Sequence, residues 1–108
     1  MPTPIAHLDI KTPNIMITYA DIEDTFHSTI KHHRNFKALI ADWGTARRVT
    51  EPIYLTANDN PIWSAPEVIM RLPVTQTADT FSFALVMWEV LGPPKILDNY
   101  TKLKFDLV

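Results

Sequence analysis

The chain has 108 residues, of which 46% are hydrophobic and 20% charged, a composition typical of one globular domain. It contains no cysteine, which excludes a disulfide scaffold and cysteine-ligated zinc, and its formal net charge of -2 gives no electrostatic reason to expect a nucleic acid or an anionic membrane as partner. Residues 1–10 lack the basic start and long apolar run of a signal peptide, so we expect a cytoplasmic protein.

Two short strands and a long connection are predicted in the first part of the chain. Residues 15–19 (IMITY) are rich in strand-forming residues and follow the turn signal Pro13-Asn14, and residues 37–41 (KALIA) form a second short apolar run. Between them, residues 20–36 are polar and mixed in charge, which is typical of an exposed loop or a partly helical excursion. We therefore expect a small hairpin with an unusually long connection.

Three histidines in this connection invite a metal-site interpretation. His27, His32 and His33 have the spacing H-x4-H-H, which is not a standard zinc-binding pattern. A solvated loop is the simpler interpretation of the segment. A histidine-loop metal-binding protein is therefore the least favoured class of function.

Two helices are predicted in the second half of the chain. Pro66 can occupy the first turn of a short helix (APEVIMRL), because a proline there loses no needed hydrogen bond, and Pro73 should end it. Residues 79–91 (DTFSFALVMWEVL) form the clearest helix, with Asp79 or Thr80 as a side-chain cap. A glycine and two prolines follow and should end this helix.

The longer helix is apolar on every side. Nine of the twelve residues from 80 to 91 are apolar, so this helix belongs in the middle of a core. The chain offers only two short strands, one short helix and a tail to cover it. We therefore expect the sequence to be a piece of a larger domain.

A dense polar cluster precedes the first predicted strand. Asp9, Lys11 and Asn14 have a spacing that suits phosphoryl transfer, because a carboxylate can accept a hydroxyl proton, an ammonium can neutralise a phosphoryl group and an amide oxygen can bind Mg²⁺. Asp42 follows the second predicted strand, where its carboxylate can bind another face of the metal. Taken alone, the first three residues would also fit a solvated turn before a strand.

Four segments in this order resemble the motifs of a protein kinase. HLDIKTPN resembles the catalytic loop H-R-D-L-K-x-x-N, ADWGTAR resembles D-F-G with its flanks, and SAPEVI matches A-P-E. ADTFSFALVMWEVL resembles the central helix of the kinase C-terminal lobe, and NPIWSAPEV is similar to tyrosine-kinase-like kinases of amoeboid protists. The resemblance covers nearly the whole chain. It implies a partial C-terminal lobe, mainly α with a small β-hairpin in an α+β arrangement, over residues 1–108, with an insertion at residues 19–36.

The resemblance also assigns catalytic roles. Asp9 would be the catalytic base, and Lys11 would contact the γ-phosphate, as in serine/threonine kinases. ATP and Mg²⁺ would be the cofactors, with Asn14 and Asp42 as metal ligands and Met16 beneath the adenine. The partner would be a protein substrate.

Other matching residues would have structural roles. His7 and Trp43 would stack in a hydrophobic spine that Asp79 anchors. Glu67 would pair with an arginine of the last helices of the lobe, which this chain does not contain.

The activation segment departs from the kinase pattern. Thr56 lies where a phosphorylation site often falls, with Tyr54 nearby, and Asn60 replaces the threonine that usually bonds the catalytic aspartate and lysine. Leu8 replaces the arginine that normally pairs with a phosphorylated loop, and leucine cannot bind phosphate. We therefore expect activity to depend only weakly on loop phosphorylation.

The largest departure is the missing N-terminal lobe. The sequence has no Gly-rich loop, no V-A-I-K lysine and no partner glutamate, so half of the ATP cleft is not encoded. We expect this chain alone to be catalytically inert or nearly so. The main alternative to a kinase fragment is a kinase-derived binding or regulatory module, although the intact Asp9, Asn14 and Asp42 argue against a long-decayed pseudokinase.

Overall fold

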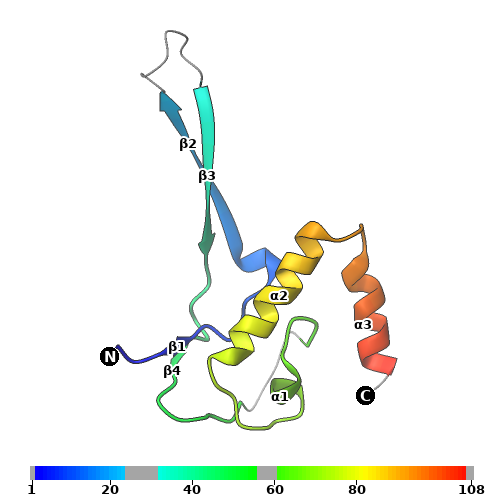
Figure 1. Cartoon of the computed structure of the whole chain (residues 1–108). Coiled ribbons are helices and arrows are strands. Elements are labelled where there is room, and N and C mark those ends of the chain that lie inside the picture. Colours follow the sequence, from blue (N-terminus) through cyan, green and yellow to red (C-terminus); the bar gives the residue numbers. More distant parts are fainter. Residues whose placement is uncertain (1, 24–31, 56–60, 107–108) are drawn as a thin grey trace.

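The computed structural model describes residues 2–23, 32–55 and 61–106, which form two antiparallel strand pairs and three α-helices (Figure 1). A long hairpin projects from a body that contains the helices, and the extents of the molecule are 59 × 39 × 19 Å. The helices of the described residues include none that is long and apolar enough to cross a membrane.

The hairpin consists of β2 (Ile15–Glu23) and β3 (His32–Ile40), which pair from Ile15 opposite Ile40 to Glu23 opposite His32. Both strands are longer than predicted, so the expected loop or partly helical excursion is wrong over 20–23 and 32–36. The reason is that strand pairing is set by the partner strand, and local composition does not reveal it.

The histidine segment also differs from expectation. His32 and His33 belong to β3 and not to a loop, while His27 lies outside the described residues. The described part of the chain contains no group of three or more His, Cys, Asp or Glu residues that is arranged to hold a metal ion.

A second, smaller strand pair joins the segment before residue 7 to the segment after residue 46. In it, β1 (Ile5–Ala6) runs antiparallel to β4 (Arg47–Arg48), with Ile5 opposite Arg48. The catalytic-loop segment leaves β1, and the segment after Asp42 enters β4. The sequence predicted no regular structure around β4, because a two-residue strand leaves almost no periodicity to detect.

The first two helices lie close to their predicted positions. Helix α1 (Pro66–Ile69) has its proline in the first turn, as expected, and the chain leaves it at Met70, before Pro73. Helix α2 (Thr77–Leu91) begins two residues earlier than predicted, and its N-cap is Gln76 without a side-chain cap bond. The prediction of Asp79 or Thr80 as the cap is therefore wrong.

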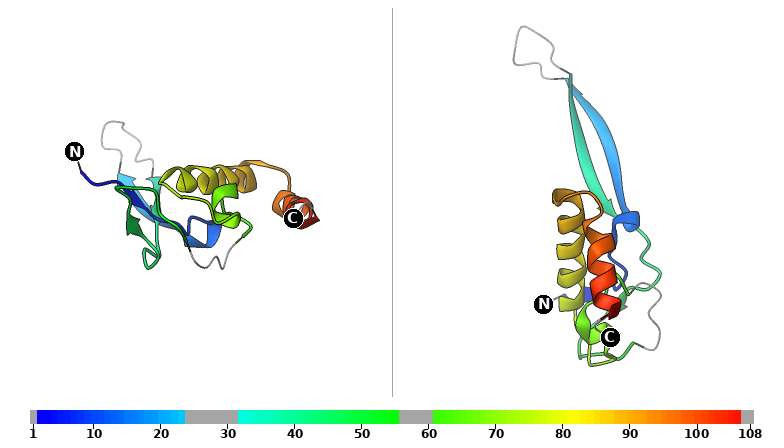
Figure 2. Two further views of the ribbon diagram at one scale, coloured as in Figure 1. Left: turned by 90° about the horizontal axis from the view of Figure 1, so that it is seen from below. Right: turned by 90° about the vertical axis from the view of Figure 1, so that its right-hand side faces the viewer.

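The tail forms a third helix that was not predicted. After Gly92, where an added Cβ would collide with the carbonyl oxygen of Trp88, the chain turns back into α3 (Ile96–Asp106). Helix α3 lies beyond the C-terminal end of α2 in the left view of Figure 2, and the two helices meet there through the rings of Trp88 and Tyr100, edge to face at 5.6 Å. This contact joins two different helices, so the local sequence pattern of the tail did not reveal it.

A small hydrophobic core lies where α1 and the start of α2 meet the preceding loops. Its buried members are Ala65, Val68, Val74 and Ala78, and partly buried apolar residues pack against them. The backbones of Ile53 and Val74 bond each other at 2.9 and 2.7 Å and close one side of this core.

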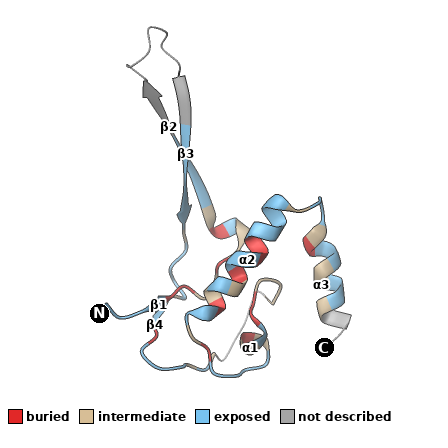
Figure 3. Cartoon of the chain, in the orientation of Figure 1, coloured by how far each residue is buried: buried red, intermediate tan, exposed pale blue. Residues whose placement is uncertain are grey.

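Helix α2 is buried on one side only (Figure 3). Ala78, Ser82, Leu85 and Val86 are buried, whereas Val90 and the last residue, Leu91, are 68% and 78% exposed. The expectation of burial on all sides is therefore wrong for the described residues. The apolar surface at the C-terminal end of the helix is left in solvent.

Candidate active site

The loop between β1 and β2 is anchored by one carboxylate of helix α2. Asp79, in the first turn of the helix, accepts hydrogen bonds from the backbone N–H of His7 at 2.6 Å and of Leu8 at 2.8 Å. Leu8 has a φ of 68°, an uncommon conformation for a residue other than glycine. The two bonds from Asp79 hold the loop in this conformation, and the Leu8 side chain packs on the hydrophobic core.

His7 joins the loop to the segment after β3. Its ring is 2% exposed, its Nδ1 accepts from the backbone N–H of Asp9 at 3.1 Å, and its Nε2 donates to the carbonyl of Ala41 at 2.9 Å. These two bonds select the neutral tautomer with the proton on Nε2. The Trp43 ring lies 4.7 Å away in an edge contact, and the Thr45 hydroxyl donates to the His7 carbonyl at 3.0 Å.

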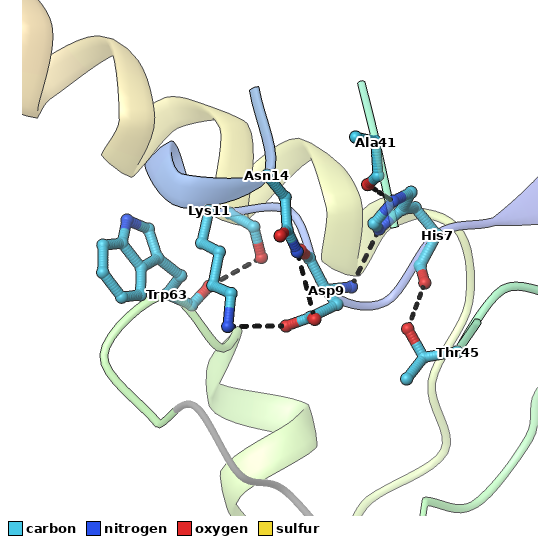
Figure 4. Close-up of polar contacts among 8 residues, drawn as sticks. His7, Asp9, Lys11, Asn14, Ala41, Thr45 and Trp63 are labelled. Atoms are coloured by element: carbon cyan, nitrogen blue, oxygen red, sulfur yellow. Dashed lines mark hydrogen bonds and ion pairs between the residues drawn. The ribbon is translucent and has the colours of Figure 1, made fainter. Parts of the chain in front are cut away.

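Two polar side chains of the loop, those of Lys11 and Asn14, approach the Asp9 carboxylate (Figure 4). Asn14 donates from Nδ2 to Asp9 Oδ2 at 3.1 Å and to the Asp9 carbonyl at 2.8 Å. Lys11 Nζ lies 3.8 Å from Asp9 Oδ1, and the two side chains are only about one-fifth exposed. A carboxylate oriented in this way, with an ammonium beside it, can accept a proton and keep a phosphoryl group close.

Asn14 also connects the loop to Asp42. The backbone N–H of Ala41 donates to the Asn14 carbonyl at 2.8 Å, and Asp42 follows with a φ of 61°. Because Asn14 bonds Asp9 through Nδ2, its other side-chain atom, the amide oxygen Oδ1, can act as a metal ligand. An amide oxygen and a carboxylate are the kinds of ligand that fit Mg²⁺, which prefers a few protein oxygens completed by waters and phosphate oxygens.

Two contacts from α2 to the site were not predicted. The Thr12 hydroxyl donates to the Glu89 carboxylate, so α2 holds the loop at its far end as well as at His7 and Leu8. The Ser82 hydroxyl, one turn after Asp79, donates to the Trp63 carbonyl at 2.6 Å. A serine and a glutamate in the mostly apolar stretch from residue 80 to 91 were the only signals in the sequence for these contacts.

The geometry can be compared with known proteins. Residues 3–105 match the family model described as the protein kinase domain. The chain belongs to the protein kinase family. The kinase loop, the segment after β3 and the central helix are therefore brought together in the order that the motifs imply.

Several similar kinases are named as serine/threonine enzymes, in part from amoeboid organisms and their viruses. A serine/threonine-protein kinase/receptor of Acanthamoeba polyphaga mimivirus is 36% identical over 107 residues, which are 97% of this chain and 6% of that protein. The probable serine/threonine-protein kinase roco8 of Dictyostelium discoideum is 29% identical over 86 residues, 80% of this chain and 4% of its own length. The rat mitogen-activated protein kinase kinase kinase 12 is 33% identical over 88 residues, 81% and 8% of the two chains. This chain thus spans less than a tenth of each of these kinases.

The remaining predicted kinase residues are more dispersed. Met16 and Tyr54 are 54% and 65% exposed, and Glu67 lies in the first turn of α1, with no ion pair found for it in the described part of the chain. Thr56 and Asn60 lie outside the described residues. The structure therefore brings together Asp9, Lys11 and Asn14, and Asp42 follows Ala41, whose backbone N–H bonds Asn14. Of the predicted activation-segment residues, only Tyr54 is described, and it is exposed.

Proposed function

We propose that this chain is the catalytic-loop part of a protein kinase that transfers the γ-phosphoryl group of ATP to serine or threonine hydroxyls of a protein substrate. The observation that carries the proposal is the Asp9 carboxylate, which Asn14 orients at 3.1 Å and which Lys11 approaches to 3.8 Å. Asp9 accepts the proton of the substrate hydroxyl, and Lys11 neutralises charge on the transferred group. The serine/threonine names of two similar kinases support this choice of acceptor.

Asn14 and Asp42 are the residues that would hold Mg²⁺. The bound ion supplies charge neutralisation for the phosphate oxygens of ATP. The protein contributes the orientation of the two ligands: the backbone bond between Ala41 and Asn14 ties the Asp42 segment to the loop at 2.8 Å. Met16, an exposed residue of β2, is the residue that we assign to the adenine.

We further propose that the activity needs chain beyond these residues. In this proposal, residues 1–108 are part of a mainly helical C-terminal lobe of a cytoplasmic kinase, with an insertion at residues 19–36. The exposed apolar end of α2 supports this proposal, because Val90 and Leu91 are 68% and 78% exposed and are not covered by the described residues. The same exposed surface supports a second candidate, a kinase-derived module that binds a partner without catalysis.

Phosphoryl transfer by the full-length protein and by residues 1–108 alone separates the two candidates. With Mg-ATP and a general protein substrate, we expect the full-length protein to label serine or threonine and the isolated chain to be inactive. A full-length protein that folds and binds partners but transfers no phosphoryl group would instead support the binding module.

A further inference from the structure

The turn at residues 61–64, just before α1, is held by its backbone carbonyls. Each of the four carbonyl oxygens accepts a hydrogen bond from a side chain of α2 or α3. Lys104 Nζ donates to the carbonyls of Pro61 at 2.6 Å, Ile62 at 3.2 Å and Ser64 at 2.9 Å. The Ser82 hydroxyl donates to the remaining carbonyl, that of Trp63.

The single ammonium of Lys104 therefore donates to three of these four carbonyls. Its ammonium also lies 5.8 Å from the centre of the Phe81 ring and 5.3 Å from that of Tyr100, within the range of cation–π attraction. Burial lowers the pKa of Lys104, because desolvation penalises the charged ammonium. An ammonium with three donors matches three carbonyl acceptors in number.

The turn borders the candidate catalytic loop. Ser82 holds the turn from α2 one helical turn beyond Asp79, which holds His7 and Leu8 of the loop. Figure 4 shows Trp63 on the same side of the site as Lys11. The indole N–H of Trp63 is buried and finds no acceptor among the described residues, so its carbonyl, and not its ring, holds this residue to α2.

We propose that Lys104 is a positioning residue for the protein substrate, because it fixes the 61–64 turn beside Asp9. The inference rests on the proposed kinase function and deepens it. In this proposal, a polypeptide that presents a hydroxyl to Asp9 contacts this turn, which lies on the Lys11 side of the site and which Lys104 of α3 holds in place. Without the ammonium, three carbonyls lose their donor and the turn no longer has one defined position.

The test compares Lys104→Met with Lys102→Met, a control on an exposed lysine of the same helix, in the full-length protein. Hydrogen exchange should be about tenfold faster at the amides of residues 62–65 in Lys104→Met, with α2 unchanged. The KM for a protein substrate should rise about tenfold while the KM for ATP stays within about twofold, since only the turn has moved. Lys104→Arg, which keeps a charged donor, should restore most of both properties.

Several results would overturn the inference. One is exchange at 62–65 that is the same in Lys104→Met and Lys102→Met. Another is faster exchange spread evenly over α2, α3 and the turn, in Lys104→Arg as well as Lys104→Met, which would assign Lys104 to general stability. A third is a loosened turn with an unchanged KM for the protein substrate. A wild-type protein without phosphoryl transfer would overturn the proposed function and the substrate effect, whereas the exchange data alone decide whether Lys104 positions the turn.

Discussion

At Leu8, an apolar side chain occupies the place where kinases usually have a phosphate-binding arginine. The structure shows what the leucine does instead: it packs on the core formed by Ala65, Val68, Val74 and Ala78. Its backbone has the uncommon φ of 68° and is fixed by Asp79. The exposed Arg47 of β4 is opposite Ala6 in the small strand pair, and it can supply only part of a phosphate pocket.

The substitution Thr56→Ala tests this interpretation of Leu8. Because leucine cannot pair with a phosphate, removal of the expected phosphorylation site should lower phosphoryl transfer by the full-length protein by less than about threefold. The measurement is kcat/KM for a protein substrate, with the loop phosphorylation state of the wild type determined by mass spectrometry. A large loss of activity in Thr56→Ala would show that another cation replaces the missing arginine.

The site residues were predictable to different degrees. The spacing of Asp9, Lys11 and Asn14 was enough to place them in one loop, because these residues are close in sequence. The bond from Thr12 to Glu89 and the three bonds from Lys104 join residues that are distant in sequence. No local pattern encodes such contacts, so they became visible only in the folded chain.

Among the elements, helix α2 organises the site. Its first turn holds the start of the loop through Asp79, its middle holds Trp63 through Ser82, and its last turns hold Thr12 through Glu89. The prediction that Asp79 caps its own helix failed because the carboxylate accepts two amides from the loop instead. A capping position and a tertiary acceptor at the start of a helix have the same residue preferences, so the sequence does not distinguish them.

The substitution Asp79→Asn should therefore cost stability. The amide keeps the size of the carboxylate but loses its charge and one acceptor, and hydrogen bonds to charged groups contribute about 1.5–3 kcal/mol each. We expect a fall of about 2 kcal/mol in the free energy of unfolding, measured by urea denaturation.

The matched control is Asp98→Asn, an exposed aspartate in the first turn of α3. It should cost less than about 1 kcal/mol, the usual size of a helix-terminus effect. Equal costs for the two variants would contradict the anchoring role of Asp79.

The hairpin is the element whose extent was least predictable. Its inner part was expected from strand-forming residues, whereas its outer part is polar and became recognisable only from the register, which pairs Asp21 with Arg34. Figure 1 shows that this outer part points away from the helices. An isolated two-stranded ribbon is at most marginally stable, so it contributes little to the stability of the body.

A shortened hairpin tests whether residues 19–36 contain a dispensable insertion. Tyr19 is directly opposite Phe36, so residues 20–35 can be replaced by Asn-Gly, which forms a two-residue turn between paired strands. We expect the free energy of unfolding to change by less than about 1 kcal/mol. Phosphoryl transfer should change by less than about threefold, because the removed residues lie away from the loop. A loss of activity without a loss of stability would instead assign the extension a part in catalysis.

In the whole molecule, part of the apolar surface of α2 is left in solvent. The other described elements do not cover all apolar residues of helix α2, and its C-terminal end is exposed. The unpredicted helix α3 covers part of it through Tyr100 and supplies Lys104, although its own sequence is mostly polar. The order of the motifs was enough to predict the family and the position of the catalytic loop. The packing of the tail could not be predicted, because it depends on contacts that form only when α2 is in place.

The central claim is that Asp9 acts as the base in phosphoryl transfer. The most direct test is kcat/KM of the full-length protein with Asp9→Asn, compared with Asp98→Asn as an exposed control. Asparagine keeps the size of the side chain but cannot accept the proton, so we predict a loss of about 10²- to 10⁴-fold with little change in the Kd for Mg-ATP. Activity of Asp9→Asn within about threefold of the wild type would contradict the claim.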